Sequence, residues 1–292
     1  MTKEENHIIK SAILMLTAAL AGAIVANSVK GLSFLFNTVI IYFFTRLFSS
    51  IGVFPSFFKK GTFLIKKNQF FLILLIAIFY NSSMYTYFYS LKTISVVDAS
   101  LLFNSAPLYV PFFASFWLNE KITRWVWVGM IISFIGVIFV LQPGVGLFKA
   151  SALWALASGV AMAASQTCNR KVAQQVSSKT IVAYLILFST LISAVPLFFV
   201  DWRTLWSEWL HHRPLFWLGI LILAGIMSWV YQLARTLAIV KVKVAQIMPL
   251  SYAGVVFAGL LGWFFFHEVP DFLSLTGTVC VIAGSIIVIR SR

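Results

Sequence analysis

Residue types that carry catalytic chemistry are scarce in this sequence and are not spaced for it. No His-Glu-x-x-His or Gly-x-Ser-x-Gly motif occurs, so neither a zinc protease nor a serine hydrolase is indicated. The segment 144–146 (GVG) lacks the third glycine of a nucleotide-binding loop. Cys168 and Cys280 lie in apolar runs without a Cys-x-x-Cys partner, which argues against a disulfide framework and a zinc site. The sequence therefore predicts no enzyme, no cofactor and no metal site.

Polar side chains inside long apolar runs are the informative residues. Polar groups are costly in lipid, so they generally face protein or a water-filled path. Asn81 and Tyr85 share one helical face in the first half of the chain, and Trp229 and Gln232 do so in the second. The residues that we expect to line a substrate cavity are Asn81, Tyr85, Asn104, Trp229, Gln232, Arg235 and Tyr252. The alternative is that they join helices by hydrogen bonds of about 0.6–2 kcal/mol each.

Charged residues within these runs add a second group of candidates. Arg46 stands near the centre of a run, where an uncompensated guanidinium costs at least about 2.5–3.5 kcal/mol. It either clamps backbone carbonyls or presents its charge to an anionic part of a substrate, and the sequence leaves both interpretations open. Arg235 either extends its charged group to the cytoplasmic membrane–water interface or acts in substrate binding or gating. Asp98 lies at the start of an apolar run that is expected to line the cavity, and it is the better candidate for proton coupling, because a desolvated carboxyl can titrate.

The elements that position these residues follow from composition. The 292 residues are 61% hydrophobic and 10% charged, with a mean hydropathy of +0.95, which excludes an ordinary soluble globule. A membrane-spanning helix needs about 20 apolar residues. Ten such runs are expected, at 9–29, 34–57, 69–90, 96–118, 125–141, 151–172, 180–200, 215–238, 244–266 and 272–289. The fold class is therefore an all-α integral membrane protein.

The positive charge is distributed as in a membrane protein. The net charge of +14 comes from short Lys and Arg clusters between the apolar runs, with no single basic surface that would indicate nucleic acid binding. Alternate crossings place fifteen basic residues on the side of the amino terminus and five on the other. We therefore expect an integral protein of a bacterial inner membrane with both termini in the cytoplasm.

The two halves of the chain repeat one another. At an offset of 148 residues Glu120 aligns with Glu268, and the glycine pairs Gly129/Gly277 and Gly136/Gly284 also coincide. The first runs of the two halves agree at an offset near 140. Five crossings per half is an odd number, so residues 1–145 and 146–292 are predicted to be inverted five-helix repeats, as in many secondary transporters. Channels can also carry inverted repeats, so this favours transport without settling its mode.

Helix breakers and small residues occur at matching places in the repeats. Pro107 and Pro249 lie in the fourth run of each half, where each removes an amide donor and frees a carbonyl. This gives either a fixed kink or part of a binding site. Glu120 and Glu268 are interpreted as structural ties at the ends of these runs. The glycines at 129, 136, 277 and 284 indicate close helix packing, and a homodimer through such a stripe remains an alternative.

The segment from Phe257 to Pro270, FAGLLGWFFFHEVP, followed by Gly277 and Gly284, resembles the drug/metabolite transporter superfamily in its EamA-type repeat. Residues 112–143 carry a weaker copy. The resemblance implies a ten-helix bundle whose central cavity is built mainly from the first, third and fourth helices of each repeat, with the fifth helices peripheral. Members of this family export or import amino acids, nucleotides, vitamins, S-adenosylmethionine or drugs.

These observations predict a secondary carrier that moves a small organic metabolite across the bilayer by alternating access. Export of an amino acid or related compound is the first hypothesis. The alternative is uptake or exchange of a nucleoside-like metabolite or a vitamin, such as S-adenosylmethionine or riboflavin. An alternative of another class is a membrane scaffold or receptor that does not transport. The expected partners are a small-molecule substrate and the lipid bilayer, without nucleic acid.

Overall fold

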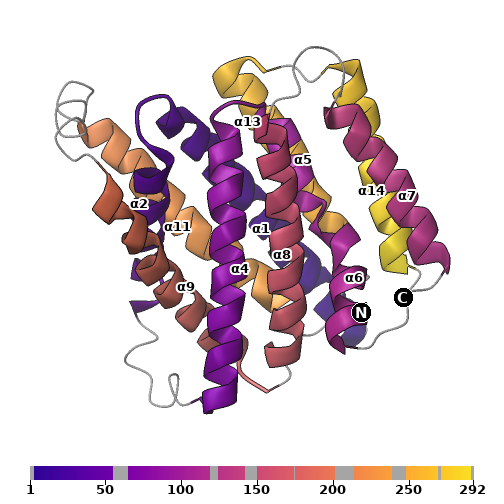
Figure 1. The fold of residues 1–292 in the computed structure, drawn as a ribbon, viewed down its shortest axis with the longest axis horizontal. Coiled ribbons are helices and arrows are strands. Elements are labelled where there is room, and N and C mark those ends of the chain that lie inside the picture. Colours follow the sequence, from indigo (N-terminus) through magenta and orange to yellow (C-terminus); the bar gives the residue numbers. More distant parts are fainter. Residues whose placement is uncertain are drawn as a thin grey trace.

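The computed structural model describes residues 3–54, 65–118, 124–141, 150–173, 175–200, 214–238, 248–268 and 271–290. Over these ranges the chain forms helices and no strands (Figure 1). The α-helices are α1 (Lys3–Ser33), α2 (Thr38–Ile51), α4 (Lys67–Leu91), α5 (Val96–Asn104), α6 (Ala106–Leu118), α7 (Arg124–Leu141), α8 (Ala150–Ala173), α9 (Ser178–Ala194), α11 (Pro214–Ala238), α13 (Ala253–Phe266) and α14 (Phe272–Arg290). Two 3₁₀ helices, η1 (Val195–Phe199) and η2 (Met248–Tyr252), complete the set.

Each predicted apolar run contains a helix, and hydroxyl or amide side chains begin several of them. Asn37, Ser95 and Ser177 are the N-cap residues of α2, α5 and α9, and each side chain accepts a backbone N–H of the first turn. Among the described residues, five helical stretches are long and apolar enough to span a bilayer: His7–Ser33, Lys67–Leu91, Val96–Trp117, Ser178–Phe199 and Leu215–Ala238. The protein is therefore an all-helical integral membrane protein.

Two of the predicted runs are interrupted. The run 96–118 divides into α5, which ends at Asn104, and α6, which begins at Ala106 with Pro107 in its first turn. In the other half, Pro249 lies in η2, which ends at Tyr252 before α13 begins. A proline cannot donate the backbone hydrogen bond that continues a helix, so a break beside it is expected. Asn104 and Tyr252 are equivalent at the 148-residue offset, so the two breaks lie at matching positions.

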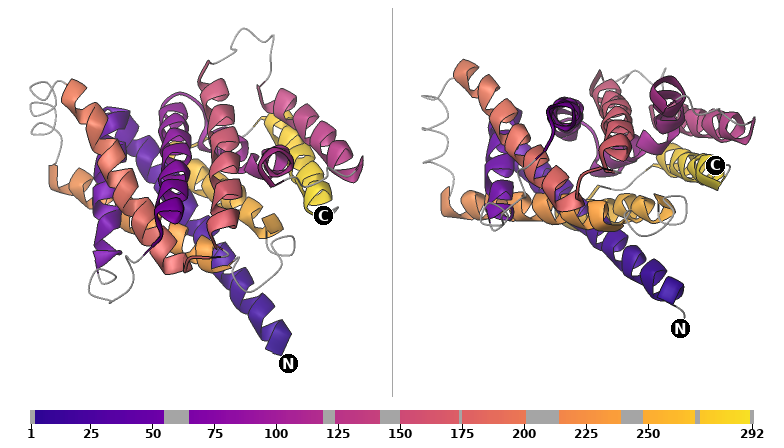
Figure 2. Two further views of the ribbon diagram at one scale, coloured as in Figure 1. Left: turned by 60° about the horizontal axis from the view of Figure 1, so that its bottom comes forward. Right: turned by 90° about the horizontal axis from the view of Figure 1, so that it is seen from below.

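The helices pack as a bundle with one peripheral pair. Helix α1 packs against α11 and α13, while α8 packs against α4, α5 and α6. Helix α2 contacts α11 and α9, and α9 also contacts α4. Helices α7 and α14 lie side by side at one edge of the molecule (Figures 1 and 2).

The predicted glycine stripes form the contact between α7 and α14. A Cβ atom on Gly136 would lie 2.6 Å from the carbonyl oxygen of Gly277, so no larger residue fits there. A Cβ atom on Gly284 would overlap Gly129 and Ser133. The stripes therefore face one another within the chain.

Candidate functional site

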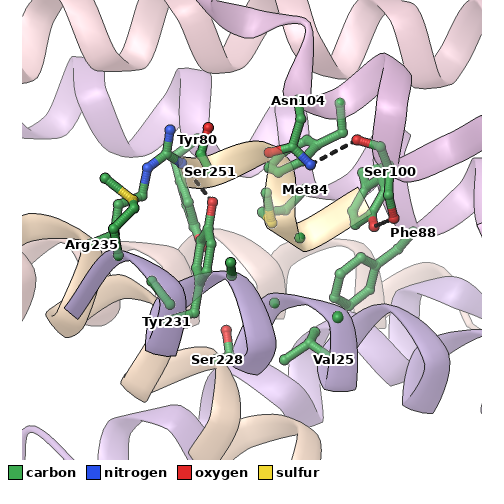
Figure 3. Close-up of a pocket in the computed structure, with 18 residues that line it drawn as sticks. Val25, Tyr80, Met84, Phe88, Ser100, Asn104, Ser228, Tyr231, Arg235 and Ser251 are labelled. Atoms are coloured by element: carbon green, nitrogen blue, oxygen red, sulfur yellow. Dashed lines mark hydrogen bonds between the residues drawn. The ribbon is translucent and has the colours of Figure 1, made fainter. Parts of the chain in front are cut away.

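A central cavity lies between α1, α4, α5, α11 and the η2–α13 junction (Figure 3). Its volume is about 50 Å³. Small residues of α1 form one wall, and aromatic rings form much of the remainder. The aromatic and polar lining residues are Tyr80, Tyr87, Phe88, Ser100, Phe103, Asn104, Ser228, Tyr231, Arg235 and Ser251. The interrupted helices contribute Asn104 and Ser251 next to their breaks.

Hydrogen bonds hold the polar wall of the cavity in place. The Asn104 side-chain amide donates to the Ser100 carbonyl oxygen at 2.8 Å, and the hydroxyls of Ser100 and Tyr87 lie 2.9 Å apart. On the other side, the Arg235 guanidinium donates to the Tyr231 hydroxyl, 2.5 Å away, and lies 5.6 Å from the centre of that ring. The cavity thus combines aromatic surface, hydroxyl groups and one cation.

The size of the cavity indicates a contracted site. Pockets that bind small molecules usually enclose about 300–1,000 Å³, whereas this one encloses about 50 Å³. Water-sized groups fit in this volume. A molecule of the size of a typical metabolite does not fit in it.

Arg46 on α2 lies directly behind the cavity wall. Its side chain is buried, with 1% of its surface exposed. Nη1 donates to the Tyr80 hydroxyl at 3.2 Å, and Nη2 donates to the Ser228 hydroxyl. Tyr80 and Ser228 themselves line the cavity. Both partners are hydroxyl groups, and among the described residues the guanidinium donates to no backbone carbonyl.

Asn81 belongs to a hydrogen-bond network outside the cavity lining. It accepts a hydrogen bond from the Tyr42 hydroxyl at 2.6 Å and donates to the Ala77 carbonyl oxygen and to the Ser189 hydroxyl. These bonds join α2, α4 and α9. Asn81 therefore connects helices, as in the alternative interpretation of the polar residues.

The other predicted lining residues occupy three kinds of place. Asn104 and Arg235 line the central cavity. Tyr85 lies in a wider groove of about 710 Å³, where the α1–α2 connection meets α4. Trp229 packs with Val53 and its neighbours, and its ring lies against Gly52. Gln232 and Tyr252 are buried, yet they are not among the residues that line the cavity.

On α4 and α11, the third helices of the two halves, the cavity face is shifted by one residue from the face that the sequence predicted. On α11 the lining residues are Ser228, Tyr231 and Arg235, whereas Trp229 and Gln232 were expected. On α4 Tyr80 lines the cavity in place of Asn81. One residue corresponds to a rotation of about 100°. In the sequence Ser228 and Tyr231 also share one helical face, but nothing in the sequence favours them over Trp229 and Gln232 as lining residues.

A largely buried ion pair lies at one end of the bundle. Lys30 on α1 pairs with Glu268 after α13 and donates to the Ile94 carbonyl oxygen at 2.9 Å. The second Glu268 oxygen accepts the Val96 backbone N–H at 2.9 Å. Val96 begins α5, where the helix dipole favours a negative charge. Glu268 thus connects α13 with α1 and α5, while Glu120 lies outside the described residues.

Asp98 lies near this ion pair and away from the cavity lining. Its two carboxylate oxygens accept hydrogen bonds from the hydroxyls of Ser95 and Ser274. Ser95 is the N-cap of α5, so Asp98 is part of the helix start and also contacts α14. A role in proton coupling stays a prediction. No cluster of three metal-ligating side chains occurs among the described residues.

Comparison with known families shows the family to which this chain belongs. The sequence model of the EamA-like transporter family matches residues 9–142 and again residues 149–290. The chain belongs to the EamA-like transporter family. It is a membrane transporter of this type and not an enzyme. The helices that line the cavity are the first, third and fourth of the first half and the third and fourth of the second, while α7 and α14 are peripheral, close to the arrangement that the family resemblance implied.

Named relatives of this EamA-like transporter differ in substrate and direction. The pseudopaline exporter of Pseudomonas aeruginosa is 28% identical over 207 residues, 70% of each chain. The S-adenosylmethionine uptake transporter of Rickettsia bellii is 25% identical over 252 residues, 86% of this chain and 84% of its own. The riboflavin transporter of Vibrio cholerae is 28% identical over 172 residues, 58% of this chain and 54% of its own. A solved crystal structure superposes with a TM-score of 0.62 over 95% of both chains at 17% identity, a likeness of fold alone.

Proposed function

We propose that the protein is a secondary carrier that exports a small organic metabolite, an amino acid or related compound, by alternating access. One observation carries this proposal: a single cavity is lined by helices from both halves of the chain, next to the two helix breaks. Transporters place their substrate sites at the interface of their repeats, beside discontinuous helices. The sequence shows no ATP-binding motif, so the energy comes from a proton or substrate gradient.

The proposal includes two inverted five-helix repeats, residues 1–145 and 146–292. The pattern of contacts supports it. In a repeat, α1 corresponds to α8 and α4 corresponds to α11. The equivalent of the α1–α11 contact is then the α8–α4 contact, and both contacts are present. The contact of α2 with α11 likewise becomes that of α9 with α4. The two separate matches of the family model point the same way.

The proposed setting is a bacterial inner membrane with both termini in the cytoplasm. The excess of basic residues on one side of the alternating crossings supports this orientation. The bacterial relatives support the setting.

Uptake is the second candidate function. It is favoured by the S-adenosylmethionine uptake transporters of Rickettsia, whose match covers 86% of this chain. The same cavity serves either direction, because the direction of flux follows the gradient and the coupling.

Counterflow into proteoliposomes tests transport itself. Vesicles are preloaded with pools of unlabelled metabolites, and the accumulation of labelled members of each pool is followed. We expect one pool to exchange, and Asn104→Ala to reduce that exchange. Thr276→Ala, an exposed position on α14, is the matched control and should behave as wild type. Absence of exchange for every pool, with folded protein, would contradict the carrier and favour a scaffold or receptor.

A further inference from the structure

Arg46 is a buried cation without a counter-ion among the described residues. The ion pair that the described part of the chain contains joins Lys30 to Glu268. Asp98 is the acidic residue that lies within a predicted span, and the hydroxyls of Ser95 and Ser274 occupy both of its oxygens. The other acidic residues of the sequence lie before, between or at the ends of the apolar runs. The positive charge in the middle of α2 is therefore not balanced by a carboxylate of the same region.

The groups around Arg46 stabilise its charge only in part. Nη1 and Nη2 donate to the Tyr80 and Ser228 hydroxyls, and Nε has no partner among the described residues. The rings of Tyr42 and Tyr80 lie with their centres 5.5 and 5.7 Å from the guanidinium carbon. Cation–π contacts of this kind are favourable but are no substitute for a negative charge.

The position of Arg46 connects this unbalanced charge to the cavity. Tyr80 and Ser228 each touch the guanidinium on one side and line the cavity on the other, and Figure 3 shows both at its wall. Both hydroxyls can rotate. If the walls move apart to admit an anion, only the Tyr80 and Ser228 side chains lie between that anion and Arg46.

We propose that Arg46, with Tyr80 and Ser228, forms an anion-binding subsite of the central cavity, and that the transported molecule carries an anionic oxygen group, a carboxylate or a phosphate. The Tyr80 and Ser228 hydroxyls accept from the guanidinium and can donate their own protons to an anionic oxygen, and the charge of Arg46 behind them strengthens both hydrogen bonds. The apolar part of the molecule then lies against Tyr87, Phe88 and Phe103. Arg235, on the same face of α11 as Ser228, adds a second cation. This inference rests on the proposed transport function.

Thermal unfolding of the full chain in lipid nanodiscs tests the subsite without a transport assay. The ten tryptophans provide the fluorescence signal. The probes are phenylacetate, its neutral analogue phenylacetamide, phenyl phosphate and inorganic phosphate. We expect phenylacetate or phenyl phosphate to raise the unfolding temperature of the wild type, and phenylacetamide not to do so. Which of the two acids acts more strongly distinguishes carboxylate from phosphate recognition.

Arg46→Met is the decisive variant. It should weaken the binding of the active acid by about 30-fold or more, the loss expected when one partner of a buried charge pair is removed. Its ligand-free unfolding temperature should not fall, because a buried charge without a counter-ion is also removed. Arg124→Met, which removes an exposed arginine at the start of α7, is the matched control and should leave both values unchanged.

Several outcomes would overturn the subsite. These are equal stabilisation by the acid and the amide, a full effect of inorganic phosphate alone, or an undiminished effect of the acid on folded Arg46→Met. If Arg46→Met does not fold, Arg46→Lys decides, because the subsite requires that this variant still prefer the acid to the amide. Counterflow separates the two proposals: absence of flux for all pools contradicts transport, whereas flux that ignores the charge of the substrate contradicts the subsite alone.

Discussion

Two asparagines that look alike in the sequence have different surroundings in the structure. The Asn81 side chain bonds to side chains of two other helices, whereas the Asn104 side chain donates to a carbonyl of its own helix. Asn81 is buried behind the wall, and Asn104 is at the cavity surface. Side chains that hold helices together and side chains that meet a substrate should therefore separate experimentally.

We expect Asn81→Ala to lower the free energy of unfolding by about 1–3 kcal/mol, because the buried Tyr42 hydroxyl loses its acceptor. Asn104→Ala should change unfolding little and change the exchange rate or substrate preference instead. Thermal unfolding and counterflow on the two variants provide the measurements. A stable Asn81→Ala variant with altered substrate preference would contradict the placement of Asn81 outside the cavity lining.

At the scale of one helix, the orientation of α11 decides which residues meet the cavity. Ser228 lines it, and Gln232, four residues further on, does not. In a variant whose Cys168 and Cys280 are replaced by serine, Ser228→Cys should react with a water-soluble thiol reagent during turnover, and the substrate should protect it. Gln232→Cys should react slowly and without protection. Labelling in vesicles, followed by mass spectrometry, measures both rates. If the substrate protected Gln232→Cys as well as Ser228→Cys, the face of α11 that the sequence predicted would also line the cavity.

The contact between α7 and α14 leaves no room for a methyl group. Gly284→Ala should cost about 1–3 kcal/mol, because the new Cβ overlaps Gly129 and Ser133 and the helices must separate. Gly219 on α11 is the matched control, since nothing lies within 4 Å of a Cβ placed there. Gly219→Ala should stabilise the helix by about 0.5–1 kcal/mol. If the unfolding temperatures of the two variants shift in the same direction, the α7–α14 contact is looser than these distances imply.

Over the whole molecule, the sequence predicted the elements well and the cavity less well. Hydrophobic runs and turn residues locate a helix by its period, so each expected run contains one. The glycines at equal offsets predicted close helix packing without naming the partner, which in the structure is the contact between α7 and α14. The cavity depends on how far each helix is rotated about its axis. An error of one residue between Ser228 and Trp229, or between Tyr80 and Asn81, exchanges the lining for the packed side. The partner of Lys30, 238 residues away, also follows only from the assembled bundle.

The ion pair of Lys30 and Glu268 provides a test of alternating access itself. It joins α1 and the end of α13 to the start of α5, three elements that line or flank the contracted cavity. Glu268→Gln keeps an acceptor for the Val96 N–H but removes the charge that pairs with Lys30, so this end should open more often. We expect faster labelling of Ser100→Cys by a membrane-impermeant reagent applied from the Lys30 side, and slower labelling from the opposite side. Lys92→Met, an exposed charge near the same end, should change neither rate. Equal acceleration from both sides would mean that the variant loosens the bundle as a whole, and unchanged rates would mean that this pair does not control access.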